Sequence, residues 1–208
     1  MYSRRAHSTE KLTLERGLPP HDFLAKAWAS EPLSNVLNGT NIAFALPEPD
    51  EDISLIAKDE EKVIGQCSTN RVVKYWNHVD VIGKAENLST EVFVKIHKKA
   101  VADEKKYLQA INQSEELAFH SAGIAVLPDY RGLNLGQTMR EKQIAICVEQ
   151  QATTLFCETT NRFSAATVEQ FGFFKIAVYS YKDLAVELES PDLNRLKDDS
   201  FSVWCRRI

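Results

Sequence analysis

VLPDYRGLNLGQTMREKQ, at residues 126–143, joins an apolar run to an amphipathic helix through Pro128, Gly132 and Gly136. A helix start leaves its first backbone N–H groups without partners inside the helix and carries a partial positive charge. A tight loop can aim those groups at a phosphate, and Arg131 would add a full positive charge. The same residues are compatible with an ordinary strand-to-helix turn, because a pair of glycines is a weak signal by itself.

The flanking sequence alternates between strand-like and helix-like segments. The segments expected as strands are 11–15, two runs of 53–73 that form a hairpin around the acidic turn DEEK, 117–127, 154–158, 173–181 and the final FSVWCRR. The segments expected as helices are 21–39, 87–111, a helix from about 134, and SAATVEQF before Gly172. In the helix after 134, Leu135, Met139 and Ile146 share one side, and Arg140, Glu141 and Lys142 lie elsewhere. This order predicts one mixed α/β domain over residues 1–208.

The composition is that of an ordinary globular protein. The 208 residues are 44% hydrophobic and 26% charged, with a formal net charge of -4, so the overall balance indicates neither nucleic-acid nor membrane binding. Cys67, Cys147, Cys157 and Cys205 lie far apart, which argues against a metal site or a disulfide framework and for reduced thiols. No signal peptide or membrane-spanning run is recognised, so we expect a soluble, cytoplasmic protein.

VLPDYRGLNLGQTM resembles motif A of the GNAT superfamily of acyl-coenzyme-A-dependent N-acyltransferases. In that motif an apolar strand and a proline precede Arg or Gln, two variable residues, Gly, one residue, and Gly or Ala. Arg131, Asn134 and Gly136 occupy the three marked places. Asn134 departs from the usual glycine, but asparagine tolerates a left-handed backbone better than other bulky residues, so we expect the loop to keep its shape.

The resemblance implies the GNAT fold, a mixed α/β architecture in which a mostly antiparallel sheet of about six or seven strands is flanked by helices. It implies acetyl coenzyme A as acyl donor, with its pyrophosphate at this loop and no metal. A bulge or splay of the central strand would leave its edge free to pair with the pantetheine arm, and a backbone N–H near Ala125 and Val126 would donate to the oxyanion. The residues implied in coenzyme binding are Ile124, Ala125, Val126, Arg131, Gly132, Leu133, Asn134, Leu135, Gly136, Thr138 and Asn161.

Two further segments resemble one branch of this superfamily. WASEPLSNVLN is similar to the Asp-Glu-Pro-Leu segment of insect-type arylalkylamine N-acetyltransferases, whose glutamate is the general base; this makes Glu31 the base candidate. In NRFSAATVEQFGFFKI, Val168 stands where a tyrosine often protonates the leaving thiolate. The branch uses serines of this stretch instead, so Ser164 is the hydroxyl candidate, with Thr160 as its companion. On its residues alone, Glu31 is equally a solvent-facing acid near a helix start.

His120 is a competing base candidate. It lies six positions before Val126 on the expected central strand, so strand periodicity predicts that both side chains point to the same face. Its reference pKa of about 6.5 suits proton removal at neutral pH. A partly buried, hydrogen-bonded strand histidine is the alternative.

The resemblance therefore implies direct transfer of an acetyl group to a primary amine, most simply a small arylalkylamine or related biogenic amine. Phe23, Trp28, Trp76 and Phe163 would either line such a site or belong to the core. Two alternatives stay open: a protein or peptide acetyltransferase acting on lysine or an N-terminus, and a non-catalytic coenzyme-A-binding sensor. The sequence does not distinguish a monomer from a homodimer.

Overall fold

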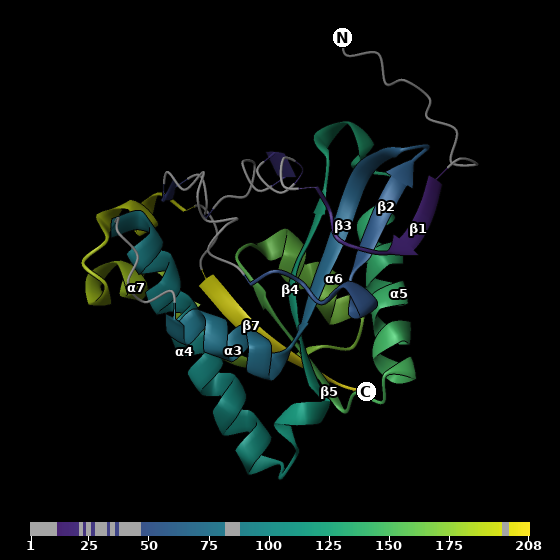
Figure 1. The fold of residues 1–208 in the computed structure, drawn as a ribbon. Helices are drawn as coiled ribbons and strands as arrows, with labels where there is room; N and C mark the ends of the chain where they lie inside the picture. The colour runs from purple at the N-terminus through teal and green to yellow at the C-terminus, as the bar shows by residue number, and fades with distance from the viewer. Residues whose placement is uncertain are drawn as a thin grey trace.

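The computed structural model of the protein describes residues 12–20, 23, 26–27, 33, 36–37, 47–81, 88–196 and 200–208. These residues form a seven-stranded sheet with helices on both of its faces (Figure 1). The strands lie in the order β1 (Leu12–Arg16), β2 (Leu55–Asp59), β3 (Lys62–Arg71), β4 (Ala118–Val126), β5 (Thr154–Thr159), β7 (Ser200–Arg207) and β6 (Phe174–Ser180). All neighbouring strands are antiparallel except β4 and β5. The mixed, mostly antiparallel sheet expected from the sequence is confirmed.

The helices are α3 (Val72–Val81), α4 (Leu88–Ala110), α5 (Leu135–Glu149), α6 (Arg162–Gln170) and α7 (Tyr181–Glu187). Short 3-10 turns are η3 (Glu51–Ile53), η4 (Glu115–Leu117), η5 (Pro128–Tyr130) and η6 (Pro191–Arg195). None of the described helices is both long and apolar enough to cross a lipid bilayer.

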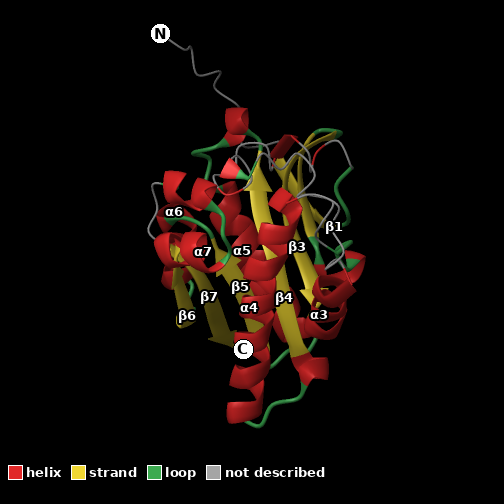
Figure 2. Cartoon of the chain, turned by 90° about the vertical axis from the view of Figure 1, so that its left-hand side faces the viewer, coloured by secondary structure: helices red, strands yellow, loops and turns green. Residues whose placement is uncertain are grey.

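Two apolar clusters hold helices to opposite faces of the sheet. On one face, α3 and α4 bury Trp76 and Leu108 against Phe156 of β5. On the other face, Met139 and Ile146 of α5 pack into the core beneath the sheet. Figure 2 shows α4 running in front of the strands and α5 behind them. All four cysteines are buried and free, as expected.

Helices α3 and α7 were not expected from the sequence. The paired β-branched residues at the start of α3 suggest a continuing strand, yet its buried residues, Val72, Tyr75, Trp76 and Val79, follow the spacing of a helix face. Packing of that face outweighs the local preference for strand. At α7, the Ser180 side chain accepts hydrogen bonds from the backbone N–H groups of Lys182 and Asp183, which ends β6 and starts the helix.

Most of the segment 21–46, including Glu31 and Trp28, lies outside the described residues. Within it, Phe23 and Leu33 are helical and buried, in keeping with the helix expected there.

Candidate active site

Strands β4 and β5 run side by side only where they begin. Residue pairs from Ala118 with Thr154 to Ser121 with Cys157 join them. Beyond this point the described part of the chain gives β4 pairs with β3 alone. The two strands therefore diverge and leave one edge of β4 open.

The open edge carries backbone hydrogen-bond donors. The Leu127 N–H donates to the Ile64 carbonyl of β3 at 2.9 Å. This bond shows which residues of β4 direct their N–H groups toward β3. In an antiparallel pair alternate residues point their N–H groups to opposite sides. The N–H groups of Val126 and Ile124 therefore point away from β3, toward the gap.

A bulge at Ala122 separates the two halves of β4. The register of β4 against β3 shifts there, so Ala122 is an extra residue in β4. A single extra residue inverts the alternation of side chains along the rest of the strand. His120 stacks on Tyr75 on the face covered by α3 and α4, whereas Val126 packs into the cluster under α5. The bulge that the family resemblance implied is confirmed, and it makes the expectation that His120 and Val126 share a face wrong.

A cavity of about 300 Å³ fills the gap between the diverging strands. It opens through the sheet, because its lining comes from α4 on one face and from α5 and α6 on the other. This volume lies at the lower end of the range typical of small-molecule sites. The lining residues are Phe93, His97, Ser121, Ala122, Gly123, Ile124, Val126, Gly136, Arg140, Glu158, Thr159, Thr160, Asn161, Ser164, Thr167 and Val168.

The loop after β4 brings the start of α5 to this cavity. Gly132 has φ 85° and Asn134 has φ 59°, so both adopt the left-handed backbone, and the expectation for Asn134 is confirmed. Arg131 directs its Nε to the Val126 carbonyl at 3.1 Å. Gly136, in the first turn of α5, lines the cavity. A helix start so placed offers N–H groups to an anion.

The start of α6 forms the opposite wall. The Asn161 side chain caps this helix by accepting from the N–H groups of Phe163 and Ser164. Ser164 lines the cavity, and its hydroxyl donates to the Asn161 carbonyl at 2.9 Å. The Asn161 side chain is therefore a helix cap. The Ser164 hydroxyl lies in the cavity wall and is hydrogen-bonded to the backbone.

Behind the cavity lies a cluster of buried ionisable side chains, which we call the buried charge cluster: Tyr75, His97, Glu104, His120 and Glu158. His120 Nε2 lies 2.8 Å from Glu158 Oε2 and 3.3 Å from Glu104 Oε1. His120 is 0% exposed and does not line the cavity. Glu158 is the carboxylate that reaches the cavity wall.

The ion pair fixes the charges of this cluster. Burial alone would lower the pKa of His120, but Glu158 and Glu104 outweigh it and raise the pKa to about 10. Burial alone would raise the pKa of Glu158, but the His120 imidazolium, together with hydrogen bonds from His120 and His97, holds it well below its usual range. Burial raises the pKa of Glu104. At neutral pH Glu158 is therefore an anion and His120 a cation.

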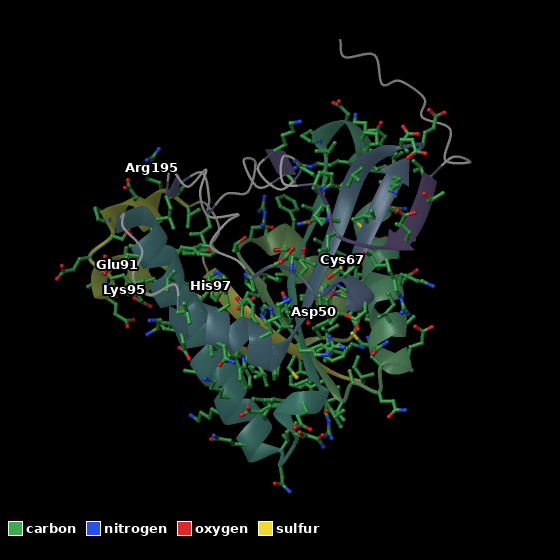
Figure 3. All side chains as sticks on the ribbon, viewed as in Figure 1. Asp50, Cys67, Glu91, Lys95, His97 and Arg195 are labelled. Carbon is green, nitrogen blue, oxygen red and sulfur yellow. The ribbon has the colours of Figure 1, made fainter. Side chains whose placement is uncertain are left out.

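His97 lies on α4 (Figure 3). It lines the cavity, and Tyr75 contacts its ring. The Tyr75 hydroxyl donates to Glu158 Oε1 at 3.0 Å and lies 2.8 Å from His97 Nδ1. When the hydroxyl proton serves Glu158, its oxygen accepts from His97 Nδ1–H. His97 Nε2 is buried without a hydrogen-bond partner among the described residues.

Glu104, His120 and Glu158 place one ligand atom each within 4.8 Å of one another, a spacing that a metal ion also uses. The 2.8 Å contact between His120 and Glu158 is an ion pair, and Trp76 Nε1 donates to the other oxygen of Glu104 at 2.7 Å. The imidazolium of His120 thus occupies the place between the two carboxylates.

Of the residues implied from the sequence, Ile124, Val126, Gly136, Asn161 and Ser164 line one cavity. The other implied coenzyme residues lie beside the cavity: Ala125 on β4, Arg131, Gly132, Leu133 and Asn134 in the loop, and Leu135 and Thr138 in the first turn of α5. Glu31 lies outside the described residues.

Sequence reasoning missed three charged or titratable residues of the lining: His97, Arg140 and Glu158. The expectation that Arg140 lies away from the buried side of its helix is wrong, because it is 5% exposed. The signal for His97 was its spacing of four residues from the buried Phe93 and Val101 on α4.

The ion pair predicts a specific pattern of stability. His120→Gln and Glu158→Gln should each lower the free energy of unfolding by about 3–5 kcal/mol, because each leaves a buried charge without its partner. The double variant should lose much less than the sum of the two. Denaturant unfolding of the four proteins measures this coupling; additive losses would contradict the ion pair.

The same pair predicts a pH dependence. The pKa of His120 rises on folding from 6.5 to about 10, so its stabilisation is complete below about pH 6.5 and is lost as the pH rises through about 10. The difference in unfolding free energy between the wild type and the double variant should shrink over that range. A difference that stays constant with pH would show that His120 is not charged in the folded protein.

Solved structures share this architecture. Arylalkylamine N-acetyltransferase 2 from Aedes aegypti superimposes with a TM-score of 0.71 at 15% identity, over 95% of this chain and 99% of that chain. A Drosophila melanogaster polyamine N-acetyltransferase that forms N-acetylagmatine gives 0.68 at 14% identity, over 95% and 100%. At such identities these structures show a shared fold.

No curated protein matches the chain by sequence. The model of the Acetyltransferase (GNAT) family matches residues 21–173. That span covers most of the chain and contains β4, the loop, α5 and the cavity walls. The chain belongs to the GNAT acetyltransferase family and is an acetyl-coenzyme-A-dependent N-acetyltransferase.

Proposed function

We propose that the protein acetylates a small primary amine that is positively charged in solution, such as an arylalkylamine or a related biogenic amine. The observation that carries the proposal is the Glu158 carboxylate in the wall of a cavity of about 300 Å³. An alkylamine with a pKa of about 10 is mostly protonated at pH 7. An anion in a largely desolvated cavity attracts such an ammonium group.

The coenzyme end of the same cavity supports the proposal. The start of α5 at Gly136 suits a pyrophosphate, and the open edge of β4 at Ile124 and Val126 suits a pantetheine arm that pairs with it as an added strand. Acetyl coenzyme A supplies the acetyl group as a thioester. One cavity thus joins the donor's site to a carboxylate suited to the acceptor.

The structural neighbours agree with an amine acceptor. One is named as an arylalkylamine N-acetyltransferase, and another is described as forming N-acetylagmatine. Both names denote enzymes of small amines, and a cavity of about 300 Å³ is of a size for such molecules.

Proton removal has two candidates. Glu31, the base implied by the family resemblance, stays our first proposal. Among the described residues His97 is the second, because its Nε2 is buried without a partner and its Nδ1 is held by Tyr75. His120 is less suited than either, since it is fully buried and its pKa of about 10 keeps it protonated.

Coenzyme affinity should depend on the backbone of the loop. Gly136→Pro removes one donor N–H at the start of α5 and should abolish acetyl-coenzyme-A binding in calorimetry. Gly136→Ala is the matched control: a Cβ there would meet only Ile124 Cγ2 at 3.9 Å, and the N–H is kept. We expect Gly136→Ala to bind nearly as well as wild type. If Gly136→Pro bound acetyl coenzyme A as tightly as the wild type, this loop would not belong to the coenzyme site.

Glu158 should set the affinity for cationic amines. The kinetic test uses the neutral pair Glu158→Gln/His120→Gln, since the single variant leaves His120 unpaired. Losing a charged hydrogen bond of about 1.5–3 kcal/mol should raise KM for tyramine or agmatine about 10–100-fold. KM for acetyl coenzyme A should hardly change.

A panel of tyramine, serotonin, agmatine, a lysine peptide and an arylamine that is uncharged at neutral pH completes this test. We expect turnover of the small cationic amines in the wild type. Preference for the lysine peptide would favour a protein acetyltransferase, and no release of coenzyme A with any amine would favour the non-catalytic sensor.

The base should be identified by ranking three substitutions. If Glu31 takes the proton, Glu31→Gln should lower kcat/KM for the amine by about 10²–10⁴ and change the acidic limb of the pH–rate profile. His97→Gln and His120→Gln should cost less. A larger loss in His97→Gln makes His97 the base, and losses below about threefold in all three assign proton removal to water.

A further inference from the structure

Arg140 is a buried cation in the wall of the cavity. It lies on α5 and is 5% exposed. Its Nη1 donates to Ser121 Oγ at 3.0 Å and to Gln143 Oε1 at 2.6 Å. Both partners are neutral, and Gln143 is held in turn by Thr69 at 2.6 Å. The guanidinium is therefore positioned firmly but not neutralised by these contacts.

No carboxylate among the described residues forms an ion pair with Arg140. Its Nε is buried without a partner there, and its guanidinium lies 5.3 Å from the centre of the Phe173 ring. The carboxylate of the cavity lining, Glu158, already pairs with His120. A buried charge without a counterion is costly, so this arrangement suits an anion that arrives from outside the protein.

The thiols around Arg140 do not supply that anion. Cys67, Cys147 and Cys157 are near enough for the guanidinium to act on their pKa values. Burial raises those pKa values to about 11 for Cys67 and about 12 for the other two. All three are neutral at physiological pH.

The reaction itself generates an anion. The amine lone pair forms a bond to the thioester carbon, the carbon–sulfur bond breaks, and its electron pair stays on sulfur as the thiolate of coenzyme A. The nitrogen loses one proton to the base, and the thiolate later takes one from water. Val168, at the usual place of a protonating tyrosine, lines the cavity but has no proton to give.

We propose that Arg140 is a catalytic residue that stabilises the leaving thiolate of coenzyme A. Arginine stays charged at all working pH values, so it acts by charge and hydrogen bonding and donates no proton. This assignment rests on the proposed function, because it requires the thioester end of the coenzyme to occupy the cavity.

The test titrates the thiol of bound coenzyme A, followed by the ultraviolet absorbance of its thiolate. The charged or titratable cavity-lining groups are Arg140, His97 and Glu158, and Glu158 by itself would disfavour a thiolate. In the wild-type complex we expect the thiol to titrate about 1–2 pH units below free coenzyme A, the equivalent of one charged hydrogen bond. Arg140→Met should abolish this shift, and Arg140→Lys should retain part of it.

Arg206→Met is the matched control. Arg206 is also partly buried, has a buried Nε without a partner in the described structure, and donates to the Phe171 carbonyl, but it does not line the cavity. It should leave the thiol titration unchanged. Affinity for desulfo-coenzyme A, which has no thiol, should be equal in wild type and Arg140→Met, whereas affinity for coenzyme A at a pH that ionises the bound thiol should fall about 10–100-fold in the variant.

Each outcome has one meaning. An unshifted thiol in the wild-type complex, a shift that survives in Arg140→Met, or a shift lost in Arg140→Lys overturns the role of Arg140. Failure of wild type to bind coenzyme A at all overturns the proposed coenzyme site instead. If Arg140→Met does not fold, the wild-type titration and Arg140→Lys still decide.

Discussion

One extra residue in β4, Ala122, imposes the geometry on which the site depends. Before Ala122, β4 pairs with β5, and the His120 side chain points to the face covered by α3 and α4. After Ala122, β4 pairs with β3 alone among the described strands, its side chains alternate in the opposite sense, and its free backbone N–H groups point into the gap. The core can tolerate the opening because α5 and α6 cover the gap from one face and α4 from the other.

The cavity wall contains two buried charges, of which one has a counterion within the described protein and the other has none. The charge of Glu158 is matched inside the protein by His120, and that match keeps it anionic in a place where burial would otherwise protonate it. The charge of Arg140 is held in position by Ser121 and Gln143 but matched by no described acid. In the proposed reaction a cationic amine arrives and an anionic sulfur leaves, so the two unequal arrangements would correspond to these two charges.

Local signals in the sequence predicted the part of the site that depends on backbone conformation. Gly132 and Asn134 mark left-handed positions that any strand-to-helix loop of this shape requires, and the structure has them. The hairpin around DEEK and the buried central strand were equally visible, because their patterns lie within a few residues.

The remaining parts depend on contacts between distant elements. Glu158 appeared as the last residue of an apolar run, and nothing near it in the sequence indicates that His120 and Tyr75, on β4 and α3, surround it. Arg140 carries a charge, so amphipathic spacing placed it away from the core, yet tertiary contacts bury it. The bulge at Ala122 was the exception, because the adjacent Gly123, with φ 150°, is a local signal for it. The bulge reversed the predicted face of His120.

The short seam between β4 and β5 has a consequence for the empty protein. In the part of the chain that the structure describes, pairs from Ala118–Thr154 to Ser121–Cys157 join the half of the sheet that contains β1 to β4 to the half that contains β5, β7 and β6. A pantetheine arm that pairs with the open edge, as proposed, would add contacts next to this seam. By mass action, the fold would then become more stable as free coenzyme exceeds its dissociation constant.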